Sequence, residues 1–235
     1  MIKYSSILLL LFVIYSCSVI QKSPRTELSD GYYTKKQGDI KQKVYVDYQS
    51  NQLVLYPVKM VKEKKVVDTT SFTSMHNNQR PKDYNNIVFL KKNSLDFDFL
   101  TIPLKYRTAR EGVPHQLNTE LNGSIYFGLR TDQFKIHYEE NPLGEYEREI
   151  KHFGFSLGAL SGLGSSVISP TTTNDLTENE YDGLIWTKGI AGIFAINSFT
   201  VGISIGIDNL LDENRAIWIY ESKPWLGIAI GLNIN

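Results

Sequence analysis

The sequence lacks several features that would define a class of protein. With a single cysteine among 235 residues, no intramolecular disulfide framework can form. No apolar run reaches the roughly 20 residues that a transmembrane helix requires, and Ala- and Glu-rich stretches typical of helices are missing. Neither sign of charge dominates, because 25 basic residues balance 25 acidic ones. This balance argues against a dedicated nucleic-acid-binding protein.

Aromatic residues are plentiful by contrast. The chain contains 14 Tyr, 11 Phe and 3 Trp, and aromatic side chains are enriched in β-strands. Together with the shortage of helix-favouring stretches, this composition predicts an all-β protein. The length suits one β-domain, or one domain with a small appendage.

The N-terminus carries the clearest motif. Lys3 precedes an apolar run at residues 7–14, which is too short for a spanning helix and is typical of a signal peptide. The run ends in residues 14–17 (IYSC), which resemble the lipobox read by lipoprotein signal peptidase. Because Cys17 has no disulfide partner, we expect cleavage before it and acylation of its sulfur with fatty acids such as palmitate. Two or more acyl chains suffice for stable membrane attachment.

These features divide the chain into four parts. We predict a lipoprotein signal peptide at 1–16, a lipidated tether at 17–30, a β-rich N-terminal segment at 31–94 and a barrel domain at 95–235. No acidic residue follows Cys17 until Glu27, so lipoprotein sorting rules favour the outer membrane over retention in the inner membrane. The side of the membrane that the body faces stays open.

Glycine and large apolar residues alternate in the C-terminal part. Only three of the 17 glycines precede residue 120, and the later ones recur between apolar residues at 153–158, 201–207 and 226–234. Period two places all large side chains on one face of a sheet and all small ones on the other. A small closed barrel in a membrane explains the pattern, with lipid-facing Val201, Ile203, Ile205, Leu226, Ile228 and Ile230. The alternative is a soluble barrel or sandwich with the large face turned inward.

From residue 95 onward the patterning predicts about eight antiparallel strands. These are 95–107, 122–130, 133–140, 151–163, 183–196, 199–208, 216–221 and 224–234. Short polar links at 131–132 and 197–198 are typical of hairpins. Five aromatic residues lie near predicted strand ends, as in interfacial belts: Tyr181, Trp186, Trp218, Tyr220 and Trp225. Two features oppose a closed membrane barrel. Pro103 interrupts the first strand, and 216–221 is shorter than a spanning strand.

The C-terminal half resembles a known family. Blocks at 101–107 (TIPLKYR), 116–123 (QLNTELNG), 181–189 (YDGLIWTKG), 200–212 (TVGISIGIDNLLD) and 223–235 (KPWLGIAIGLNIN) are similar to uncharacterised Bacteroidota proteins described as outer-membrane β-barrel lipoproteins. The resemblance implies a membrane barrel and no established activity, so it assigns no functional residues. The final Asn235 departs from the terminal aromatic that barrel-assembly machinery commonly recognises.

No catalytic constellation emerges from the sequence. The G-x-S-x-G pattern around Ser156 lacks the following helix of a nucleophile elbow. Asp208, Asp212 and Asn214 lack the spacing of a calcium loop, and turn chemistry explains them better. The four histidines share no metal-ligand spacing: His76, His115, His137 and His152. We therefore expect no enzyme, no metal and no cofactor.

One modification site is suggested outside the barrel. Residues 68–70 (DTT) resemble the acceptor motif for general O-glycosylation in Bacteroidota, with Thr69 as the acceptor. They open a polar loop at 68–86 where a sugar could be accommodated.

The leading hypothesis is an outer-membrane lipoprotein with a β-barrel body and a structural or recognition role without catalysis. Its predicted partner is membrane lipid, through acylated Cys17 and the barrel wall. The alternative is a lipid-tethered soluble β-barrel that binds an apolar small ligand. A hydrolase that uses Ser156 is a remote third hypothesis.

Overall fold

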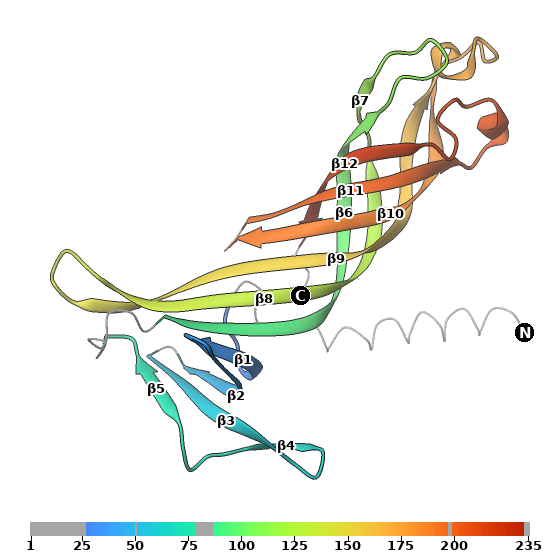
Figure 1. Ribbon diagram of the computed structural model, residues 1–235. Coiled ribbons are helices and arrows are strands. Elements are labelled where there is room, and N and C mark those ends of the chain that lie inside the picture. The colour runs from blue at the N-terminus through green and yellow to red at the C-terminus, as the bar shows by residue number, and fades with distance from the viewer. Residues whose placement is uncertain (1–26, 50, 79–86, 197–198, 233–235) are drawn as a thin grey trace, which may run out of the picture.

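The computed structural model describes residues 27–49, 51–78, 87–196 and 199–232, and in this part the chain is all-β, as composition predicted (Figure 1). Twelve strands in these residues form one sheet with antiparallel pairing. Two short 3-10 helices accompany them, η2 (Pro170–Thr173) and η3 (Glu213–Ala216). No helix in the described ranges is long and apolar enough to cross a membrane. The predicted signal peptide and Cys17 lie outside the described residues.

Six strands close into a ring. They are β6 (Val88–Arg107), β8 (Asn122–Glu140), β9 (Tyr146–Ile168), β10 (Tyr181–Ile196), β11 (Phe199–Leu210) and β12 (Pro224–Leu232). Each pairs with the next, and β12 closes the ring by pairing with the C-terminal half of β6. A short strand, β7 (Gln116–Thr119), pairs with β6 beyond the start of β8. We call this unit the six-stranded ring.

The prediction of about eight strands was wrong in two places. Residues 131–132 form no hairpin, because Thr131 and Asp132 pair with β9 inside one long strand, β8. Asp132 is polar because it faces charged groups inside the ring, so polarity there was not a turn signal. Residues 216–221 contain turns and the end of η3, and one isolated bridge joins Glu221 to Asp208. The link predicted at 197–198 lies outside the described residues, although Ile196 pairs with Phe199.

Pro103 is accommodated within the closed sheet by a β-bulge. The register between β6 and β12 shifts, so that Leu104 pairs with Ile228 while Thr101 pairs with Ile230. Bulges are among the few places where a strand tolerates proline, since the missing amide hydrogen falls where the ladder is already interrupted. The backbone of neighbouring Ile102 instead exchanges two hydrogen bonds with the Asn122 side chain.

The N-terminal segment is β-rich, as predicted from residue 31. It forms β1 (Gly31–Gln37), β2 (Ile40–Gln49), β3 (Gln52–Val61), β4 (Lys64–Val67) and β5 (Thr73–His76). The strand β1 pairs with the N-terminal end of β6. The polar stretch predicted as a loop at 68–86 thus contains a strand, β5, which pairs with β3.

A conventional apolar core holds this segment against the long strands. The N–H of Arg148 and the hydroxyl of Tyr138 reach the carbonyls of Asn77 and His76, so the chain after β5 returns to β8 and β9. The buried core residues are Leu28, Tyr33, Val44, Val46, Leu53, Leu55, Met75, Val88, Leu90, Phe134 and Ile136. Three strands, β6, β8 and β9, therefore serve both this N-terminal core and the six-stranded ring (Figure 1).

The face of small residues predicted from period two lines the inside of the ring. Gly158 pairs with Gly128, and Gly189 pairs with Gly206. A Cβ atom at Gly158 would overlap the backbone of Phe127 and Gly128. A Cβ atom at Gly189 would likewise overlap the backbone of β11. Glycine is required because the curvature of so narrow a ring brings neighbouring backbones together on the concave side.

Candidate functional site

Large apolar side chains cover the outside of the six-stranded ring. All six residues predicted as lipid-facing point outward, with exposed fractions of 44–57% (Val201, Ile203, Ile205, Leu226, Ile228 and Ile230). The other strands continue the same surface with Leu95, Phe97, Phe99, Ile125, Phe127, Leu129, Phe153, Phe155, Leu157, Ile190, Phe194 and Ile196. We call this surface the apolar band. Contiguous exposed apolar surfaces of such extent mark contact with a membrane or a protein.

The apolar band ends abruptly within the long strands. Along β8 the outward side chains change from Ile125, Phe127 and Leu129 to Thr131, Gln133 and Lys135. Along β6 the same change occurs between Leu95, which pairs with Leu129, and Asn93, which pairs with Thr131.

On β9 the change falls between Lys151 and Phe153, the residue that pairs with Gln133. A line of polarity change therefore crosses three adjacent strands. A boundary shared by three strands is expected where an apolar environment meets water.

The interior of the ring holds a buried ionic network. The Nζ atom of Lys105 lies 3.0 Å and 3.1 Å from the Asp208 carboxylate oxygens and 2.8 Å from a Glu120 oxygen. Arg107 Nη2 donates to Glu120 at 2.8 Å and to Asp208 at 2.6 Å. All four side chains are at most 3% exposed, and their formal charges cancel. Burial of ions requires this kind of pairing, because an isolated charge in a low-dielectric interior is strongly destabilising.

Aromatic rings surround the two cations. Lys105 Nζ lies 4.8 Å from the ring centre of Trp225, and Arg107 stacks near Trp218 and Tyr220 at 5.4 Å and 5.2 Å. Cation–π contacts of this kind stabilise desolvated charges. The expectation that these aromatic residues form an interfacial belt was wrong, because all three are buried by the interior charges. Trp186, which is exposed on the outer face beside Lys188, fits that expectation.

A second group of polar side chains lies in the interior toward the N-terminal core. Arg130 Nε donates to both oxygens of Asp132, and His152 Nε2 lies 2.7 Å from the same carboxylate. Ser156 lies further along β9, with its hydroxyl 2.8 Å from that of Tyr126. The strand continues through Ser156 without a turn or helix, so the residue does not occupy a nucleophile elbow.

The alternation of residues along β11 contains a sequence signal for the buried position of one of the interior ions. Asp208 lies on the same alternation as Gly202, Ser204 and Gly206, which predicts that it faces inward. The prediction that turn chemistry explains Asp208 is wrong, since Asp208 is fully buried within β11. Turn chemistry does explain Asp212, whose carboxylate caps η3 by accepting from Asn214 N–H.

Three side chains at the far end of the β8–β9 hairpin could approach a metal ion. His137 Nε2 lies 2.8 Å from Glu139 and 3.2 Å from Glu149. The Lys151 ammonium lies 3.3 Å from both carboxylates, so a cation from the chain itself already neutralises them. Sequence spacing could not reveal this cluster because its members meet across two strands.

The remaining candidates lie apart. His115 stacks on Tyr106, and His76 lies beside Ser74. Thr69 is exposed in a turn, where the Asp68 carboxylate accepts from the backbone and hydroxyl of Thr70. An acceptor hydroxyl at Thr69 is therefore accessible, and its glycosylation stays a prediction.

Comparison with protein-family models, with curated proteins and with solved structures finds no match to this chain.

Proposed function

We propose that this protein is an outer-membrane lipoprotein whose six-stranded ring sits in the bilayer as a small β-barrel. Its role is structural or in recognition, without catalysis. The observation that carries the proposal is the continuous apolar outer surface of the ring, which encloses an interior where paired ions lie beside a buried apolar cluster. Water-soluble monomers rarely expose so extensive a contiguous apolar surface.

Energetic considerations support a membrane environment. Transfer of one large apolar side chain out of water contributes about 1.5–3 kcal/mol, and each strand of the ring presents several such residues. Outer-membrane barrels ordinarily contain eight or more strands. Here glycine at the concave contacts and compact ion pairs in the interior make a narrower ring sterically feasible.

The alternative of a tethered soluble barrel that binds an apolar ligand has less support. It requires Ile203 and Ile205 to line an interior cavity, but both point outward. The described interior combines a buried apolar cluster with glycine, serine and charged groups, and the side chains of this cluster pack against one another where such a ligand would lie (Leu100, Ile102, Tyr126, Leu160, Ile193 and Trp225).

The decisive experiment removes the acyl anchor. Cys17→Ser, exported through an ordinary signal peptide, should still sediment with outer membranes and resist alkaline carbonate extraction, because the apolar band holds it. Adding Ile203→Asp should lower the temperature at which the inserted barrel unfolds, because a charge on the lipid face is destabilising, whereas the matched change Gln133→Asp below the polarity boundary should not. Recovery of Cys17→Ser as folded, monodisperse protein in the soluble periplasmic fraction would contradict the barrel.

Acylation itself is tested separately. Metabolic labelling with an alkyne fatty acid should tag the native protein and leave Cys17→Ser unlabelled. Equal labelling of the two proteins would exclude Cys17 as the acylated residue.

A further inference from the structure

Lysines gather on the outer face directly beside the apolar band. Cross-strand pairing places them in two neighbouring rows of the sheet, on the face opposite the N-terminal core. We call this set the lysine face, and it comprises Lys36, Lys41, Lys43, Lys91, Lys135 and Lys151. All are exposed except Lys135, which is half-buried.

Within the lysine face, two pairs of lysines lie directly opposite each other on neighbouring strands. Lys36 pairs directly with Lys41, and Lys135 pairs directly with Lys151. Like charges in this position destabilise a sheet. Among the described residues, Lys151 is the only member that forms a salt bridge, and Lys43 donates to the hydroxyl of Thr34. This contrasts with the ring interior, where Lys105 and Arg107 both contact carboxylates. The positive charge of the other five lysines, which no salt bridge among the described residues compensates, favours an anionic partner outside the chain.

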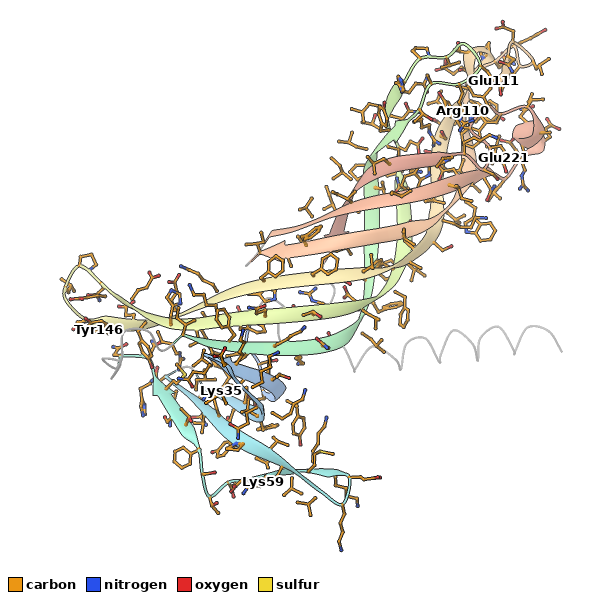
Figure 2. All side chains as sticks on the ribbon, in the orientation of Figure 1. Lys35, Lys59, Arg110, Glu111, Tyr146 and Glu221 are labelled. Carbon is orange, nitrogen blue, oxygen red and sulfur yellow. The ribbon has the colours of Figure 1, made fainter. Side chains whose placement is uncertain are left out.

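The position of the lysine face indicates which partner that is. Lys91 lies four residues before Leu95, at the edge of the apolar band, so a bilayer around the band presents its headgroups here. The strands β8 and β9 are joined at this end by the short segment 141–145, and β10 and β11 by 197–198. The connections at the other end, around Arg110, Glu111 and Glu221 in Figure 2, are longer: 108–121, 169–180 and 211–223.

Outer-membrane barrels keep short turns in the periplasm and long loops outside the cell. The lysine face therefore meets the periplasmic leaflet, which consists of phospholipid. The predicted anchor agrees with this side. Cys17 precedes the first described residue by ten positions, a reach of about 35 Å at most, and the chain then enters the N-terminal core at Leu28.

We propose that the lysine face binds the phosphate groups of anionic glycerophospholipids in the leaflet that holds the acyl chains of Cys17. The inference rests on the proposed membrane barrel and adds its orientation and its lipid preference. Each lysine near an anionic surface strengthens binding about fivefold, so three lysines acting together correspond to about a hundredfold.

The test counts bound lipids on the full-length acylated protein in a neutral detergent. Native mass spectrometry follows titration with phosphatidylglycerol or with zwitterionic phosphatidylcholine. The wild type should bind phosphatidylglycerol at least tenfold more tightly, and K36Q/K41Q/K135Q should lose this preference. The matched control K59Q/K62Q/K64Q removes the same charge from β3, β4 and their turn, where Lys59 lies far from the ring (Figure 2), and should keep the preference.

Equal affinity of the wild type for both lipids would overturn the proposal, as would equal losses in the two triple variants. These outcomes are separable from failure of the barrel itself. Carbonate extraction of Cys17→Ser reports membrane insertion and does not depend on the charge of the lipid headgroups.

Discussion

The N-terminal core and the six-stranded ring share three strands, yet the ring buries ions beside its apolar residues and has an apolar outer surface, whereas the N-terminal core is apolar and the outer face beside it is polar. In β8, the inward residues Phe134 and Ile136 belong to the apolar core, whereas the inward residues Arg130 and Asp132 form an ion pair. The outward side chains change in the opposite sense, from Lys135 to apolar residues before Thr131. One continuous strand thus lies in two environments. The polarity of its inward and outward side chains changes at the point where the N-terminal core gives way to the ring.

The largest expected effect is on the free energy of unfolding, when a carboxylate is removed from the buried ions of the ring and, for comparison, from an exposed ion pair of the N-terminal segment. Asp208→Ala leaves Lys105 and Arg107 with Glu120 alone, and breaking a buried network in this way costs about 3–5 kcal/mol. Asp68→Ala removes a carboxylate that pairs with exposed Lys59 and accepts from Thr70 in a surface turn, so the loss of stability should be much smaller. Guanidinium unfolding in detergent measures both variants. Equal free energies of unfolding for the two variants would show that the interior network does not stabilise the ring.

Glycine variants test the close contacts of the ring. Gly158→Ala places a methyl group against the backbone of β8 and should destabilise the protein by about 3 kcal/mol. Gly192 lies on the outer face, where a Cβ atom would meet only Phe155 at 3.7 Å, so Gly192→Ala should be tolerated. The readout is the temperature at which the folded band disappears on a gel run without boiling. A stable Gly158→Ala would show that the ring is wider than described.

Valine variants compare the two apolar surfaces directly. Val46 is fully buried in the N-terminal core, and Val46→Ala should cost about 2 kcal/mol in detergent. Val201 is 52% exposed on the apolar band, so Val201→Ala should leave unfolding in detergent nearly unchanged. A similar cost for both would place Val201 in a packed interior and contradict the orientation of β11.

The smallest effect concerns pH. Hydrogen bonds from His137, and further contacts with Glu149 and Lys151, lower the pKa of Glu139 from 4.5 to about 2. A depressed carboxyl pKa stabilises the folded state above pH 4.5, and this contribution is lost as the pH falls toward 2. Carboxyl NMR titration should show this midpoint, with a larger upward shift in His137→Val than in Lys151→Met. A titration midpoint of Glu139 near 4.5 in the wild type would show that these contacts with His137, Glu149 and Lys151 do not form.

Much of the ring follows from alternation in the sequence, but its closure does not. Period two places Ile203 and Ile228 on the face opposite Gly202 and Gly227, whichever side is buried. It cannot identify the bulge at Pro103, nor show that Glu120 and the distant Asp208 contact the same two cations, because both depend on register between strands. Thr131 and Asp132 were misread because a turn and a change of environment both place polar residues inside an apolar pattern.

The central claim is that the apolar band lies in lipid up to a boundary within β8. Spin labels on single cysteines introduced along this strand test the claim in vesicles, in a Cys17→Ser background that leaves each introduced cysteine as the only thiol. Labels at Ile125, Phe127 and Leu129 should collide with lipid-soluble oxygen and be shielded from a water-soluble nickel complex. Labels at Gln133 and Lys135 should show the reverse. Nickel access at all five positions would contradict a membrane-embedded ring.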